Sequence, residues 1–200
     1  MSDPRNVAIL IFDEVEVLDF AGPFEVFGVA GRANKQRLFN VYTVAARPGP
    51  VLARNRLSIN PAHTFEDCPP PRILLIPGGS GTRPLLEDAR VIDWIRAAAG
   101  RAELALSVCT GALLLAKAGL LDGLSATTYH TAFDELRALA PETTLCPGLR
   151  FVDNGRVMTS AGISAGIDMA LYVVGKLHGL EEAFAAARYM EYDLNPELLA

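Results

Sequence analysis

Short apolar runs that alternate with helix-like segments are the feature that most constrains how this chain folds. The runs are continuous and rich in branched side chains, as in "VAILIF" at 7–12, which is typical of strands buried on both faces. The expected strands cover residues 7–12, 39–46, 72–79 and 104–108, with a hairpin at 151–160. The expected helices cover residues 22–32, 88–100, 110–121, 131–140, 164–179 and 181–192. This alternation predicts an α/β fold with a mostly parallel sheet between two layers of helices.

Proline and glycine indicate where several of these elements begin and end. Pro23 suits the first turn of its helix, and Gly100 suits the end of the helix that it closes. The Asn-Gly pair within 151–160 predicts a tight hairpin turn. Residues 49–65 are expected to leave the sheet as a polar hairpin, and residues 193–200 are expected to fray.

Size and charge narrow the class of protein. The 200 residues match a single domain of ordinary size, spanning residues 1–200, and are enough to bury a core without disulfides. The net charge of −5 and the scattered basic residues argue against nucleic acid as a partner, because phosphate binding favours a basic face. No stretch reads as a signal sequence or a membrane span. We therefore expect a cytoplasmic protein with no membrane partner.

The cysteines are few and far apart. Cys68, Cys109 and Cys146 form no CxxC motif, and the three histidines are not clustered with them, so neither a zinc site nor another metal site is expected. Thiols stay reduced in the cytoplasm. Cys68 and Cys146 lie in expected loops and are interpreted as structural. We expect no metal and no organic cofactor.

Cys109 stands at the junction between an expected strand and an expected helix, in "LALSVCTGALLLAKAG". A residue on such a sharp turn projects above the sheet, and small residues are needed two places to either side, where Ser107 and Gly111 stand. The N-terminus of the following helix favours an anion, so the thiol is expected to ionise more easily than a free one. This pattern predicts a nucleophile elbow. The alternative is a small buried side chain, as most free cysteines are.

Two other junctions lie at the same expected edge of the sheet. In "PGGSG", Gly78 and Gly79 directly follow a strand, and their amides can donate to a developing negative charge or simply form a tight turn. Asp19 precedes the helix expected near Pro23, where an Asp is most often a helix cap; the alternative is a carboxyl group that reaches Cys109. His130 follows a short strand-like run and is expected to enter the same crevice.

Four segments together resemble the DJ-1/PfpI superfamily, also called ThiJ/PfpI proteins. They are "VAILIFDEVEVLDFAGPFEVF", "LLIPGGSG", "SVCTGALLLAKAGLLDGLSATTYH" and "VMTSAGISAGIDMAL". Within it the chain is most similar to the isonitrile (isocyanide) hydratase branch and to the amidase-like domain of AraC-type regulators, over about residues 6 to 192. The resemblance implies a flavodoxin-like three-layer sandwich, related to class I glutamine amidotransferases, and a homodimer.

The resemblance also implies roles for individual residues. Cys109 would be the reactive cysteine and Asp19 the acid that faces it, while the amides of Gly79 and Thr110 would line an oxyanion-type pocket. The protease-like branch has a histidine directly after the cysteine, where this chain has Thr110, so peptidase activity is not expected. The regulator branch carries an additional helix-turn-helix domain, which residues 1–200 lack, so direct DNA binding is not expected. The hydratase branch is expected to read "ATTHW" where this chain reads "ATTYH", which predicts a different pocket wall.

Three functions compete on this site. The first is hydration of an isonitrile to an N-substituted formamide, with a Cys109 thiolate as nucleophile and Asp19 as acid and base. The second is glyoxalase-like or amidase-like activity on another small-molecule substrate. The third is non-enzymatic redox sensing or ligand binding through an easily oxidised cysteine.

Overall fold

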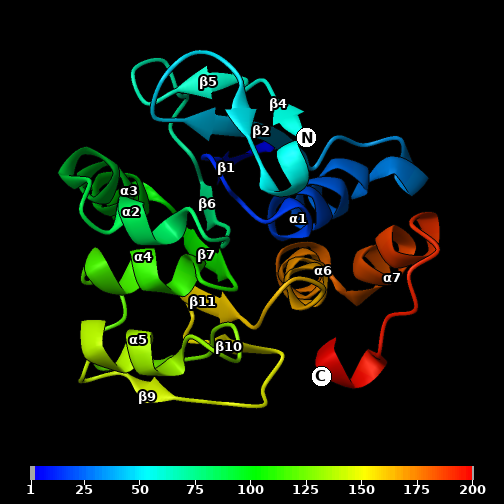
Figure 1. The fold of residues 1–200 in the computed structure, drawn as a ribbon. Coiled ribbons are helices and arrows are strands. Elements are labelled where there is room, and N and C mark those ends of the chain that lie inside the picture. Colours follow the sequence, from blue (N-terminus) through cyan, green and yellow to red (C-terminus); the bar gives the residue numbers. More distant parts are fainter. Residues whose placement is uncertain (1–2, 200) are drawn as a thin grey trace.

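A seven-stranded sheet lies between two layers of helices in the structure, a computed structural model that describes residues 3–199 (Figure 1). The strands follow the spatial order β10-β11-β7-β6-β1-β2-β5. Their bounds are β10 (Phe151–Asp153), β11 (Val157–Ser160), β7 (Leu104–Val108), β6 (Ile73–Ile76), β1 (Arg5–Leu10), β2 (Phe39–Ala45) and β5 (His63–Thr64). Neighbouring strands of this sheet pair in parallel except β10 and β11, which form the predicted hairpin. The predicted α/β class is confirmed.

The helices divide between the two faces of the sheet. Their bounds are α1 (Val17–Val29), α2 (Thr82–Leu85), α3 (Ala89–Arg101), α4 (Gly111–Lys117), α5 (Phe133–Leu139), α6 (Ala165–His178) and α7 (Leu180–Tyr189). Helices α1, α6 and α7 pack together on one face, and α2 to α5 cover the other (Figure 1). Because both faces are covered, β6 and β7 are buried at every position, which explains their unbroken apolar sequences.

The sheet reverses its direction of growth between β1 and β6. From β1 the chain moves outward to β2, and from β6 it moves the opposite way to β7 and β11. The register across this point pairs Ile9 with Leu75 and Leu75 with Leu106. Where an open parallel sheet reverses in this way, the helices separate to opposite faces and leave a crevice at the carboxyl ends of the strands. Two cavities of this protein lie at that edge.

The two helix boundaries that the sequence placed at Pro23 and Gly100 both differ in the structure. Helix α1 begins at Val17 rather than near Pro23, so the proline lies inside the helix, where its ring is buried close to Gly166 of α6. Packing of α1 against α6 therefore offsets the backbone hydrogen bond that an interior proline removes. Gly100 does not end α3, which continues to Arg101. The helix stops there because the chain turns into the next strand.

The predictions for the excursion at residues 49–65 and for the tail at residues 193–200 also differ from the structure. Residues 49–65 contain an antiparallel pair, β3 with β4, as expected, but β5 joins the main sheet beside β2. The tail does not fray over its described part, because Leu194 and Leu199 are buried and the last turn packs on α6. Residue 200 lies outside the described residues. The remaining short elements are β3 (Val51–Leu52), β4 (Ser58–Ile59), β8 (Ser125–Ala126), β9 (Thr144–Leu145), η1 (Arg32–Asn34), η2 (Arg54–Arg56) and η3 (Pro196–Leu199).

Candidate active site

Cys109 occupies a strained turn between β7 and α4. Its φ of 58° lies in the left-handed region, which residues with a side chain rarely adopt. The turn is held on both sides: the Cys109 amide lies 3.1 Å from the carbonyl of Ser160 and 3.2 Å from that of Ala161, and Thr128 Oγ1 donates to the Cys109 carbonyl at 2.8 Å. Strain of this kind persists where the surroundings hold the residue in place, and it is frequent at functional sites. The elbow predicted from the sequence is present.

Glycines allow the β6 loop to approach this turn. A Cβ on Gly111 would lie 2.0 Å from the carbonyl oxygen of Ile76, a distance that no side chain permits. A Cβ on Gly78 would lie 2.6 Å from the Thr110 nitrogen and 2.8 Å from the Cβ of Cys109. The "PGG" and "CTG" motifs therefore face each other across direct main-chain contact.

Asp19 reaches this turn from the first turn of α1. Its side chain is fully buried. One carboxyl oxygen accepts a hydrogen bond from the Gly78 amide at 3.0 Å, and the other accepts one from the Ile163 amide at 3.0 Å. The N-cap of α1 is Glu16, so Asp19 is not the cap that its sequence position favoured. It instead joins the loops that follow β6 and β11.

The Asp19 carboxyl lies close enough to the Cys109 thiol for each group to alter the pKa of the other. Burial raises the pKa of Asp19 to about 7, against the opposing effect of the Gly78 amide. Burial, followed by the adjacent Asp19 charge, raises the pKa of the Cys109 thiol well above its ordinary value. The expectation of an easily ionised thiol is thus corrected: desolvation outweighs the Thr110 amide, which lowers that pKa. Above a pH of about 7 the pair keeps one proton between two groups.

Thr110 ties the two facing loops together through its side chain. Its Oγ1 accepts from the Gly79 amide at 3.0 Å and lies 3.2 Å from Thr82 Oγ1. The amides of Gly78 and Gly79, expected to line an oxyanion pocket, are therefore engaged by Asp19 and Thr110. The Thr110 amide lowers the pKa of the Cys109 thiol, because a nearby N–H group favours negative charge on the sulfur.

The cavity over Cys109 has a volume of about 210 Å³. In addition to Cys109 and Thr110, it is lined by Glu16, Arg54, Ser80, Arg83, Tyr129 and Ile163. The arginines make exposed ion pairs, Arg54 with Glu14 and Arg83 with Glu135. Polar and charged residues therefore predominate among those that line this cavity.

The structure places His130 outside this cavity. Its side chain is exposed and lines a neighbouring depression of about 320 Å³. The preceding residue, Tyr129, lines both spaces and packs on Gly162, where a Cβ would lie 2.5 Å from the Tyr129 ring and 3.6 Å from the Cys109 sulfur. Tyr129 was not predicted from the sequence to line the cavity, although its place in "ATTYH", next to His130, was a usable signal.

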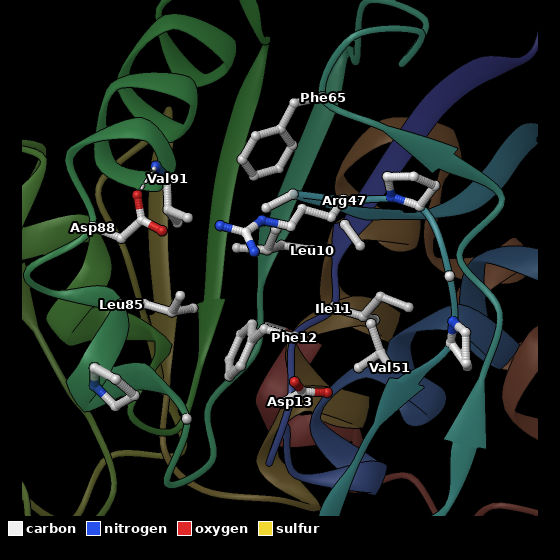
Figure 2. Close-up of a pocket in the computed structure, with 17 residues that line it drawn as sticks. Leu10, Ile11, Phe12, Asp13, Arg47, Val51, Phe65, Leu85, Asp88 and Val91 are labelled. Atoms are coloured by element: carbon white, nitrogen blue, oxygen red, sulfur yellow. Dashed lines mark hydrogen bonds between the residues drawn. The ribbon is translucent and has the colours of Figure 1, made fainter.

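A larger cavity of about 450 Å³ lies on the other side of the β1 loop, at the carboxyl ends of β1 and β2 (Figure 2). It shares no lining residue with the cavity over Cys109. Within residues 3–199, no group of three or more His, Cys, Asp or Glu side chains is arranged to hold a metal ion. No helix among these residues is long and apolar enough to cross a membrane.

Comparison with known proteins assigns the family. The profile of the DJ-1/PfpI family matches residues 5–176. The chain belongs to the DJ-1/PfpI family. Among DJ-1/PfpI relatives, the isonitrile hydratase of Pseudomonas putida is 38% identical over 190 residues, which cover 94% of this chain and 78% of that protein. The transcriptional regulator GbdR of Pseudomonas aeruginosa is 26% identical over 191 residues, and the chain spans about half of its length.

Solved DJ-1/PfpI structures confirm the fold. A ThiJ/PfpI family protein from Pseudomonas syringae superposes with a TM-score of 0.87 at 32% identity, covering 97% of this chain and 77% of that one. An AraC family transcriptional regulator from Pseudomonas putida superposes with a TM-score of 0.81 at 17% identity, covering 94% of this chain and 100% of that one. The regulator shows that the fold alone does not determine function.

Proposed function

We propose that this protein hydrates an isonitrile to an N-substituted formamide, with Cys109 as nucleophile and Asp19 as acid and base. The observation that carries the proposal is that the buried Asp19 carboxyl lies beside the buried Cys109 thiol, which lines a small cavity. The 38% identity to an isonitrile hydratase over most of the chain supports the same reaction class. The chemistry needs no metal or organic cofactor.

The first step adds the thiol across the terminal carbon of the isonitrile. A bond forms between the Cys109 sulfur and that carbon, and the proton shared with Asp19 moves to the same carbon. The product is a thioimidate, R–N=CH–S–Cys109, and Asp19 is left as a carboxylate. An acid with a pKa near the working pH suits this proton transfer. The rate constant kcat/KM is expected to rise as the pH increases through about 7, because Asp19 must be ionised to take the proton of the Cys109 thiol.

The second step consumes one water. The water oxygen attacks the thioimidate carbon while the Asp19 carboxylate takes one proton from the water. Asp19 then passes that proton to the nitrogen. The carbon–sulfur bond then breaks, the carbonyl of R–NH–CHO forms, and the hydroxyl proton returns to the Asp19–Cys109 pair. The Thr110 amide at the sulfur supports the departing thiolate.

The competing functions have less support from the same geometry. Amidase-like or glyoxalase-like chemistry relies on free oxyanion donors, whereas the Gly78 and Gly79 amides are already engaged. Redox sensing favours an exposed thiolate, whereas Cys109 is 5% exposed and its pKa is raised. The homodimer that the resemblance implies stays a prediction, which analytical ultracentrifugation would test.

The test follows two signals. One is the loss of isonitrile absorbance from para-nitrophenyl isocyanide, and the other is the NMR signal of the formamide proton in the product formed from a small alkyl isonitrile. We expect turnover by the wild type, none by Cys109→Ala, and unchanged turnover by the matched controls Cys68→Ala and Cys146→Ala. Turnover that survives in Cys109→Ala would exclude the mechanism. Absence of turnover in every variant, with both substrates, would exclude the proposed reaction and make another small electrophile such as methylglyoxal the next substrate to assay.

A further inference from the structure

The larger cavity is separate from the cavity over Cys109, with which it shares no lining residue. It lies where the β1 and β2 strands end, between α3 and the excursion that carries β3 and β4 (Figure 2). This is the side of the switch point that the Cys109 site does not use. Crevices at the carboxyl ends of an open parallel sheet are where ligands bind in such folds, and about 450 Å³ is a usual size for a small-molecule site.

One wall of the cavity is apolar and held in place. Leu10 and Phe12 are buried at the end of β1, and Val91 is buried on α3. Phe65 completes this wall and is stacked on Trp94, with ring centroids 4.3 Å apart and an interplanar angle of 5°. A side chain fixed in this way is preorganised to contact a ligand, because it loses little conformational freedom on binding.

Charged groups converge on the same space. One carboxylate oxygen of Asp88 accepts hydrogen bonds from the amides of Arg90 and Val91. One carboxylate oxygen of Asp13 accepts a hydrogen bond from the Leu52 amide. The second oxygen of each makes no hydrogen bond or ion pair with another described residue. The Arg47 guanidinium likewise makes no hydrogen bond or ion pair with another described residue. In Figure 2 it extends across the cavity toward the side where Asp88 lies.

From this arrangement we infer that the cavity beside Arg47 and Asp88 binds an α-amino acid with an apolar side chain. The ammonium faces Asp88, the carboxylate faces Arg47, and the side chain covers the wall formed by Leu10 and Phe65. A simple anion would meet two carboxylates, and a simple cation would leave the guanidinium unmatched. A zwitterion matches both charges at once, and charge-assisted hydrogen bonds of this kind are stronger than neutral ones.

The test uses three probes that share one apolar body. L-phenylalanine carries both charges, 3-phenylpropanoate lacks the ammonium, and 2-phenylethylamine lacks the carboxylate. Trp94 is the one tryptophan of the chain and stacks on Phe65, so its fluorescence reports on the cavity. Amide chemical shifts of Val51 and Phe65 in a ¹⁵N-labelled sample locate the bound probe. Cys109→Ala is titrated in parallel and is expected to bind unchanged, which separates this site from the proposed hydration.

We expect L-phenylalanine to bind about tenfold more tightly than either analogue. Arg47→Gln should remove its advantage over 2-phenylethylamine, and Asp88→Asn should remove its advantage over 3-phenylpropanoate, whereas Arg56→Gln, an exposed arginine of the same excursion, should change nothing. Equal affinity for the three probes, an unaltered L-phenylalanine affinity in Arg47→Gln, or no response of Trp94 and the cavity amides would each overturn the inference.

Discussion

The cavity over Cys109 and the cavity beside Arg47 lie at the same edge of one sheet but are built differently. The first depends on the main chain: a residue at positive φ, and glycines in contact with backbone atoms. The second depends on side chains, an aromatic and aliphatic wall with charges around it. The strained turn at Cys109 therefore depends on main-chain positions that few residues can adopt, whereas the cavity beside Arg47 depends on volume and charge that many residues can supply.

The largest effect is expected when one methyl group is added to the turn at Cys109. Gly111→Ala places a Cβ 2.0 Å from the Ile76 carbonyl, so either β6 or the elbow must move. We expect a loss of about 4 kcal/mol in the free energy of unfolding, measured by urea denaturation. Gly28→Ala, whose Cβ meets nothing within 4 Å, is the control. Equal stability of the two variants would contradict the role of main-chain contact.

Asp19 predicts a pH effect that the other cavity lacks. Its pKa is 3.8 for the ordinary group and about 7 in the folded protein. Below 3.8 both states are protonated; as pH rises to about 7 the unfolded chain ionises first, so the folded state loses stability, and above 7 the loss stays constant. Asp19→Asn should abolish this slope of about 1.4 kcal/mol per pH unit.

Urea denaturation at several values between pH 4 and pH 8 measures this slope, with Asp93→Asn, on the exposed face of α3, as the control. The pH dependence of the variant relative to wild type is the decisive quantity, because an asparagine cannot accept both amide hydrogen bonds. A wild-type slope that survives in Asp19→Asn would show that another group causes it.

Substitution of Tyr129 is expected to have a smaller effect, which concerns access of reagents to the Cys109 thiol rather than stability. Tyr129 lines both the Cys109 cavity and the depression beside His130. Tyr129→Ala should join the two and raise the ratio of Cys109 alkylation rates by a bulky and a small iodoacetamide about tenfold, equivalent to about 1.4 kcal/mol. Tyr129→Phe keeps the ring and should keep the wild-type ratio. An unchanged ratio in Tyr129→Ala would exclude the ring as the barrier, and mass spectrometry locates the modification.

The smallest effect is expected in the second cavity. Asp88 caps α3 by accepting the amides of Arg90 and Val91, so Asp88→Ala should cost about 1 kcal/mol of stability. Asp88→Asn keeps the cap and should cost a few tenths. Thermal unfolding of both variants checks this order. A loss in Asp88→Ala as large as that in Gly111→Ala would remove the distinction between the two cavities.

Local sequence patterns predicted the main features of the reactive site. Cys109 between a strand and a helix, with Gly111 two places on, predicted the elbow, and the strand-ending Gly78 and Gly79 predicted a loop facing it. The protonation of Cys109 was not predictable in this way. A helix start lowers a thiol pKa over a short range. Burial raises the pKa of Cys109, and the groups around it come from the loops after β6 and β11 and from Asp19 of α1, which are distant in sequence.

The amino-acid sequence by itself determined the layered α/β architecture, because continuous branched runs and helical spacing are local properties that stay the same in any packing. The tertiary structure alone decided that Asp19 bonds to the loops after β6 and β11 instead of capping its helix. It also decided that Tyr129 rather than His130 faces the thiol, and that a second cavity lies beside Arg47. Each of these depends on which side chains meet across the sheet edge and on how much water their packing excludes, and neither quantity can be read from neighbours along the chain.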